Sequence, residues 1–206
     1  MRRGGPAFAA VVLAGGPGRR MGHPAKATLT VGGTPMLTRV LAAVADASPR
    51  IVVGPPVGLD LPPDVRTTVE DPPGGGPVAA AAAGLGLLGD LAGDARVAVV
   101  AADLPFLTPD DVLAMRIISG RAGFDGAVMV DDDGQRQWLC GVWRLGALRS
   151  RLAAVGDPAG VAMKTFLKGL RAVRTTSPGL APPAWFDCDT ESDLRRAEEW
   201  SHGDAG

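Results

Sequence analysis

The 206-residue chain has no tyrosine, only two cysteines and almost no net charge, and each shortage excludes a class of protein. Without tyrosine, the Tyr-Lys pair that many short-chain dehydrogenases use is unavailable. Cys140 and Cys188 lie far apart and outside any CxxC or Cys/His cluster, so neither a disulfide framework nor a metal site built on cysteine is expected. The 21 basic and 22 acidic side chains give a net charge of −1, which provides no broad attraction to nucleic acid.

Long hydrophobic runs are also absent. The longest apolar stretch, Val78–Leu88, consists mostly of Ala and Gly and is too short to span a bilayer. The first six residues are basic, but the apolar segment after them is short and runs straight into a glycine loop, unlike a signal peptide. We therefore expect a cytoplasmic protein that binds neither membrane nor nucleic acid.

Short apolar runs without polar alternation predict the buried strands of a parallel sheet. In the first half, strands are expected at Phe8–Leu13, Ile51–Val53 and Val97–Ala101, and helices at Met36–Ala47, Val78–Leu88 and Pro109–Ser119. In the second half, strands are expected at Gly126–Val130, Leu139–Trp143 and Ala172–Thr175, and helices at Leu145–Val155, Val161–Leu170 and Glu191–Trp200. The alternation predicts an α/β fold: one Rossmann-like, doubly wound, mostly parallel sheet with an irregular C-terminal extension. A single domain over residues 1–206 is expected, flexible at 1–6 and 202–206.

The most informative segment follows the first expected strand. Its glycines allow backbone N–H groups to approach a ligand closely, and the nearby cations suit a nucleoside triphosphate. A Walker A loop would need Ser or Thr directly after its lysine, but Ala27 follows Lys26. A dinucleotide fingerprint would need a third glycine at position 21, where Met21 stands. Neither common glycine motif fits.

The segment reads Leu-Ala-Gly-Gly-x-x-x-Arg-Met-Gly from Leu13 to Gly22, with Lys26 four residues later. This signature resembles that of the nucleotidyltransferase superfamily of sugar-nucleotide pyrophosphorylases, and most closely the molybdenum cofactor guanylyltransferases. A second loop, from Val69 to Ala79, resembles the family segment that meets the base and ribose. Asp103-Leu-Pro, after a buried strand, resembles the family's Asp-x-Pro motif at the sheet edge where open α/β folds bind ligands.

The resemblance implies transfer of GMP from GTP to the phosphate of molybdopterin, with release of pyrophosphate and Mg²⁺ as cofactor. It also implies transient contact with molybdoenzyme maturation proteins. The residues to which it assigns catalysis are Arg20, Lys26 and Asp103. The nucleotide-binding residues would be Leu13, Ala14, Gly15, Gly16, Gly18, Lys26, Asp71, Gly76 and Asp103. The metal ligands would be Asp103 and Asp189.

The sequence departs from the family pattern near its C-terminus. Asp187 and Asp189 stand where the family carries asparagines, and either Asp189 or Thr190 could cap the helix that follows. A carboxylate can replace an amide oxygen at a hard cation, so metal binding remains compatible with the change. Three alternatives stay open: a nucleotidyltransferase with another base or acceptor, such as cytidylyl transfer to molybdopterin; an inactive nucleotide-binding regulator; and a scaffold that binds partners through the Val78–Leu88 helix.

Overall fold

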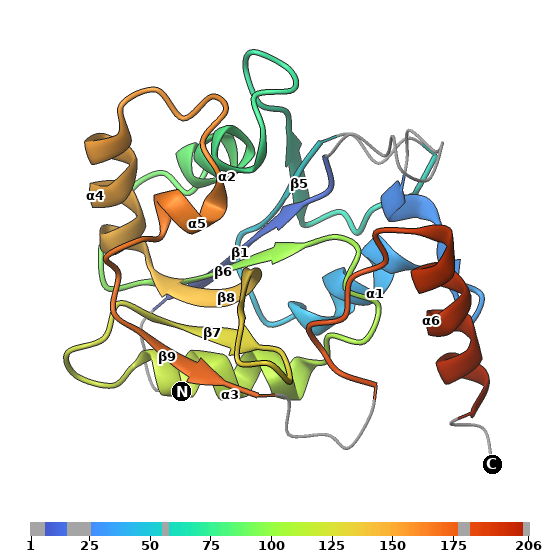
Figure 1. Ribbon diagram of the computed structural model, residues 1–206. Coiled ribbons are helices and arrows are strands. Elements are labelled where there is room, and N and C mark those ends of the chain that lie inside the picture. Colours follow the sequence, from blue (N-terminus) through green and yellow to red (C-terminus); the bar gives the residue numbers. More distant parts are fainter. Residues whose placement is uncertain (1–6, 16–25, 55–57, 177–181, 204–206) are drawn as a thin grey trace, which may run out of the picture.

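The computed structural model describes residues 7–15, 26–54, 58–176 and 182–203. A seven-stranded sheet runs through this part of the chain in the order β5-β4-β1-β6-β8-β7-β9 (Figure 1). The strands are β1 (Phe8–Leu13), β4 (Arg50–Val53), β5 (Val65–Thr68), β6 (Arg96–Ala101), β7 (Gly126–Val130), β8 (Arg136–Arg144) and β9 (Ala172–Thr175). Only β8 runs antiparallel to its neighbours, so the expectation of a mostly parallel sheet is confirmed.

Helices cover both faces of the sheet, as Figure 1 shows. The helices α1 (Met36–Ala43) and α3 (Pro109–Ser119) pack on one face. The helices α2 (Pro77–Gly86), α4 (Leu145–Val155) and α5 (Met163–Phe166) pack on the other. Every residue of β1 is buried, because its alternate side chains enter the two cores on opposite faces.

The helix α2 lies unusually close to the sheet. A Cβ atom on Gly84 would stand 2.5 Å from Cγ1 of Val11 and 2.9 Å from Cγ2 of Val53. Small residues in this helix therefore serve helix–sheet packing. The second glycine loop leads directly into α2. The distance between α2 and the sheet therefore also determines how close that loop lies to the sheet.

Three expected helices end earlier than the sequence pattern indicated. The helix α1 ends at Ala43 instead of Ala47, and α2 ends at Gly86 instead of Leu88. The ten-residue helix expected at Val161–Leu170 is only the four-residue α5, because tight turns flank it: Val161 N–H donates to Pro158 O, and Leu170 N–H donates to Leu167 O. Apolar residues in these turns still enter the core, which produced the helix-like spacing.

Several short elements had not been expected. They are the 3-10 turn η2 (Lys26–Thr28), the hairpin strands β2 (Thr30–Val31) and β3 (Thr34–Pro35), and the edge strand β5. Strand β5, with the sequence Val-Arg-Thr-Thr, has no apolar run because it lies at the edge of the sheet and exposes Arg66 and Thr67.

The last helix, α6 (Glu191–Gly203), packs against the β2–β3 hairpin, where Gly32 N–H donates to Glu198 Oε2 at 3.0 Å. It includes the first two residues of the segment expected to be flexible. Its Trp200 ring lies 4.9 Å from the Phe186 ring and 5.7 Å from the Phe106 ring, centroid to centroid. We call α6 with these three aromatic rings the C-terminal clamp. It ties the end of the described chain both to the segment after Lys26 and to the segment after Asp103.

Among the described residues, no helix is long and apolar enough to cross a membrane.

Candidate active site

The site lies at the carboxyl ends of β1 and β6. Chain order reverses here, since β4 and β5 extend the sheet on one side of β1 and β6 continues it on the other. In open α/β sheets this switch point is where ligands bind. Ala14 N–H donates to Val53 O at 2.8 Å, and Ala102 N–H donates to Leu13 O at 3.0 Å. Leu13 is buried, Ala14 is half-buried and Gly15 is exposed, so the chain emerges from the sheet at the position predicted for the nucleotide.

Gly54 shapes the beginning of the glycine loop. Its φ of +97° is in the region that favours glycine, and a Cβ atom there would stand 2.7 Å from the backbone nitrogen of Gly15. Only a residue without a side chain lets the end of β4 pass this close to the end of β1. No sequence pattern assigned Gly54 to the site, but in the structure the Gly15 backbone packs directly against it.

The second glycine loop reaches the same edge of the sheet, after β5. Asp71 is exposed in this loop, and Gly76, the residue before α2, has a φ of +89°. The Glu70 carboxylate accepts a hydrogen bond from Gly74 N–H at 3.1 Å and also lies beside Gly15. A Cβ atom on Gly15 would stand 3.8 Å from Glu70 Oε2, so Glu70 lies where the two loops adjoin, a position that no sequence pattern indicated.

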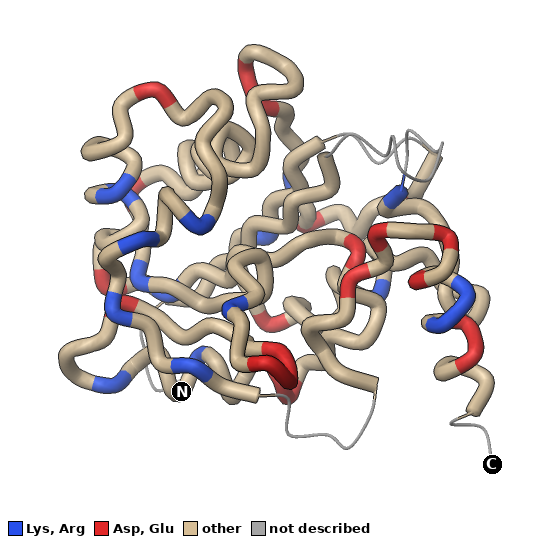
Figure 2. The backbone as a smooth tube through the Cα atoms, in the orientation of Figure 1, with Lys and Arg blue, Asp and Glu red and all other residues tan. Residues whose placement is uncertain are grey.

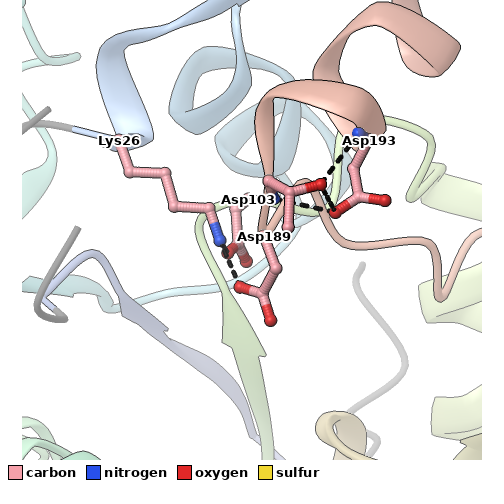
Figure 3. Close-up of polar contacts among 5 residues, drawn as sticks. Lys26, Asp103, Asp189 and Asp193 are labelled. Atoms are coloured by element: carbon pink, nitrogen blue, oxygen red, sulfur yellow. Dashed lines mark hydrogen bonds and ion pairs between the residues drawn. The ribbon is translucent and has the colours of Figure 1, made fainter. Parts of the chain in front are cut away.

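The charged side chains of Lys26, Asp103 and Asp189 meet beside the end of β6, as Figure 3 shows. The Nζ atom of Lys26 donates to Oδ2 of Asp103 and, at 2.5 Å, to Oδ1 of Asp189. Lys26 and Asp103 are 17% and 18% exposed, whereas Asp189 is 52% exposed. The three residues come from η2, from the end of β6 and from the segment before α6. The structure thus brings together two predicted catalytic residues and both predicted metal ligands.

Asp189 is available to Lys26 because its neighbour caps the helix. Thr190 Oγ1 accepts from Asp193 N–H at 3.2 Å, and Asp193 Oδ2 accepts from Thr190 N–H at 2.8 Å (Figure 3). This reciprocal pair is a capping box, and it satisfies the start of α6 without Asp189. Of the two cap candidates in the sequence, the structure selects Thr190.

Among the residues that the structure describes, this site has more acidic than basic side chains. Figure 2 shows acidic positions gathered around the start of α6. Burial, together with the charges of Asp189 and Asp103, raises the pKa of Asp187 to about 6, although Lys26 opposes this rise. Desolvation lowers the pKa of Lys26, but its ion pairs with Asp103 and Asp189 more than compensate and raise it above its usual 10.5. The Lys26 ammonium therefore pairs with two carboxylates and interacts electrostatically with a third, that of Asp187.

The backbone fixes this cluster in place. Cys188 N–H donates to Asp103 O at 3.2 Å, so the segment carrying Asp187 and Asp189 is joined directly to the end of β6. Burial raises the pKa of the Cys188 thiol to about 12, which makes it a packing residue.

Three of the predicted site residues belong to the part of the glycine loop before Lys26. Gly16, Gly18 and Arg20 lie outside the described residues. Within the described ranges no group of three or more His, Cys, Asp or Glu side chains is arranged to hold a metal ion. The Asp103–Asp189 pair has the Lys26 ammonium between its oxygens.

A glycine-supported loop, a second glycine turn and a Lys–Asp cluster at the switch point define an α/β nucleotide-binding protein. The family model of the MobA-like NTP transferase domain matches residues 10–175 of this chain. The chain belongs to that family, as its motifs had indicated. Asp187 and Asp189 lie beyond the matched range.

Relatives extend the similarity to nearly the whole chain. A molybdenum cofactor guanylyltransferase from Cereibacter sphaeroides is 31% identical over 95% of this chain and 97% of its own length. One from Nitrobacter hamburgensis is 32% identical over 98% of both chains. The crystal structure of molybdopterin-guanine dinucleotide biosynthesis protein A from Archaeoglobus fulgidus has a TM-score of 0.66 over 93% of this chain and 97% of its own, at 21% identity, which supports the fold.

Proposed function

We propose that the protein transfers GMP from GTP to the phosphate of molybdopterin and releases pyrophosphate. An acceptor phosphate oxygen forms a bond to the α-phosphorus of GTP, and the bond from that phosphorus to the β-phosphate oxygen breaks. The attacking oxygen is already anionic, so no strong general base is required. The observation that carries the proposal is the Lys26–Asp103–Asp189 cluster at the switch point. The names of relatives that align along nearly the whole chain supply the base and the acceptor.

In this reaction the chain's own residues position the substrates and neutralise charge. The backbone around Gly15, supported by Gly54, holds the triphosphate, with Gly16, Gly18 and Arg20 continuing the loop outside the described residues. The Lys26 ammonium offsets the charge that develops on the phosphates. Leu13 and Ala14 line the base, whereas the loop with Asp71 and Gly76 meets the base and ribose.

Asp103 and Asp189 are the residues that would hold Mg²⁺. Carboxylate oxygens are the donors that this cation prefers, and the two side chains already converge on one positive group, the Lys26 ammonium. In the described part of the cluster one ammonium faces two carboxylates, and this remaining negative charge favours a further cation. Bound there, Mg²⁺ would neutralise triphosphate charge and polarise the α-phosphate. The cytoplasmic location and the contact with maturation proteins remain predictions.

The first test measures pyrophosphate release with GTP, CTP or ATP, each with and without molybdopterin. We expect rapid release only when GTP and molybdopterin are both present. Faster release with CTP would overturn guanylyl transfer while leaving the family assignment intact. Release independent of any acceptor would show simple hydrolysis, and no release with any nucleotide would favour the inactive regulator.

The second test separates the two carboxylates by titrating turnover with Mg²⁺. Asp103→Asn should nearly abolish turnover, because this carboxylate is a required ligand in the proposed site. Asp189→Asn should retain activity but need more Mg²⁺, since an amide oxygen replaces one anionic ligand. Asp90→Asn, an exposed change outside the site, is the matched control. A normal Mg²⁺ requirement in Asp189→Asn would remove that residue from the metal site, and normal turnover in Asp103→Asn would remove the site altogether.

A further inference from the structure

The strand β8 extends past β6 at the edge that carries the active site. Val100 of β6 pairs with Cys140 of β8, and the antiparallel β8 continues beyond this pair as far as Arg136. Arg136 also pairs with Val130, at the carboxyl end of β7. Because β6 and β7 both run antiparallel to β8, their carboxyl ends lie at one edge. The strands β6 and β8 are neighbours, and neighbouring strands are about 5 Å apart. Arg136 therefore lies one strand away from the chain that leads to Asp103.

A bulge in β8 lies at this position. Between the pairs Val128–Gly141 and Val130–Arg136, two steps along β7 are matched by five along β8. Bulges occur next to active sites, where they redirect side chains. Here the neighbours Trp138 and Leu139, which a regular strand would place on opposite faces, both pack against the core formed by α2, α4 and α5.

The redirected tryptophan supports Arg136. The guanidinium carbon of Arg136 lies 5.2 Å from the centre of the Trp138 ring, a cation–π contact that restricts the long side chain. Asp131, in the acidic turn before β8, forms no ion pair with Arg136. Its carboxylate instead accepts hydrogen bonds from Gln135 N–H at 2.7 Å, from Asp133 N–H at 3.1 Å and from Gln137 Nε2 at 2.8 Å.

Arg136 is therefore a restrained cation with unused donors. Among the residues the structure describes, its guanidinium makes the Trp138 contact and no hydrogen bond or ion pair. A guanidinium presents a planar set of donors that matches the oxygens of a phosphate or carboxylate. An anionic acceptor that approaches Asp103, Asp187 and Asp189 meets repulsion from that side, and a cation on the neighbouring strand counteracts it.

We propose that Arg136 binds an anionic group of the phosphorylated acceptor, and that Trp138 is the positioning residue that holds Arg136 in place. The inference rests on the proposed transfer reaction and adds an acceptor-binding residue to it. Arg136 thereby serves the acceptor, whereas the loops at the ends of β1 and β5 serve the nucleotide.

The experiment compares steady-state kinetics for molybdopterin with calorimetric binding of GTP. Arg136→Met should raise the KM for the acceptor about tenfold or more, with a smaller change in kcat and an unchanged Kd for GTP. Arg136→Lys should have an acceptor KM between those of wild type and Arg136→Met, because it keeps the charge but loses the planar donors. Arg116→Met is the matched control. Arg116 also lies over an aromatic ring, 4.8 Å from the centre of the Phe8 ring, but Phe8 is at the amino end of β1, away from the active site.

Trp138 tests the positioning role. Trp138→Leu should reproduce the higher acceptor KM, and Trp138→Phe should largely restore the normal value because it retains an aromatic face. Thermal melting of each variant identifies any loss of folding, and the KM comparison uses variants that melt like wild type. A normal acceptor KM in a folded Arg136→Met, or an equal weakening of GTP binding, would overturn the inference. If the wild type itself transfers no GMP to molybdopterin, the proposed function fails and this inference with it, whereas wild-type transfer with an unaffected variant rejects Arg136 alone.

Discussion

The close seating of α2 on the sheet predicts opposite effects for the same substitution at two positions of one helix. A Cβ atom on Gly84 would enter the space of Val11 and Val53, whereas one on Gly86 would meet nothing within 4 Å. Replacing glycine by alanine inside a helix stabilises it by about 0.5–1 kcal/mol, and Gly86, as the last residue of α2, should gain the lower end of that range. Overpacking a core costs about 1–3 kcal/mol. Gly86→Ala should therefore stabilise the protein, whereas Gly84→Ala should lower its free energy of unfolding by up to about 2 kcal/mol.

Urea denaturation and thermal melting of both variants measure this difference. A gap of about 1–3 kcal/mol between them corresponds to roughly 2–12 °C in melting temperature for a chain of this size. GTP binding is the second measurement, because Gly76 of the second glycine loop caps the start of α2 and a displaced helix would shift that loop. Gly84→Ala should bind GTP more weakly than Gly86→Ala. Equal stability of the two variants would refute the tight helix–sheet contact, and equal stability with unequal GTP affinity would show that Gly84 acts on the site by another route.

Three further predictions concern the loops and one helix start. Lys26→Ala should lower turnover about a hundredfold, and its melting temperature should also fall because Asp103 loses the cation that neutralises it. Gly54→Ala should weaken GTP binding measured by calorimetry, since its Cβ atom would collide with the Gly15 backbone and strain a positive φ. Thr108→Ala should cost about 1 kcal/mol in urea denaturation through loss of the α3 cap, whereas Thr108→Ser should retain most of the stability.

For each of these three predictions, one outcome would contradict the expected effect. Unimpaired turnover in Lys26→Ala would exclude its ammonium from the reaction, and an unchanged melting temperature would show that its ion pairs contribute little to folding. Normal GTP affinity in Gly54→Ala would mean that the glycine loop adapts to a side chain there. Equal losses in the alanine and serine variants of Thr108 would show that the hydroxyl does not provide the stabilisation.

Local signals explain which elements the sequence predicts well. The bounds of α3 agree with the prediction at both ends because its start is encoded by Thr108 and Pro109, and its end by Gly120. Strand β1 is equally clear, since a strand buried on both faces reads as a continuous apolar run. Strand β5 and the short α5 were misjudged because exposure at the sheet edge removes the apolar pattern from one, and core-facing turns imitate a helix around the other.

The site shows the same division between local and distant information. Its glycine loop and Asp103 are readable because each follows its own apolar strand. The pairing of Lys26 with Asp189 joins residues from opposite ends of the sequence, and no local pattern specifies it. The bulge that redirects Trp138 depends on register with β7, which only the assembled sheet defines.

The C-terminal clamp has a consequence for the order in which the protein is completed during synthesis. All seven strands of the sheet, together with Lys26 and Asp103, precede residue 176 and can be in place before α6 leaves the ribosome. Asp189 and the rings of Phe186 and Trp200 arrive only afterwards. A nascent chain can therefore have a finished sheet while Lys26 still has one carboxylate partner instead of two. The cluster of Lys26, Asp103 and Asp189 is thus completed later than the sheet that carries it.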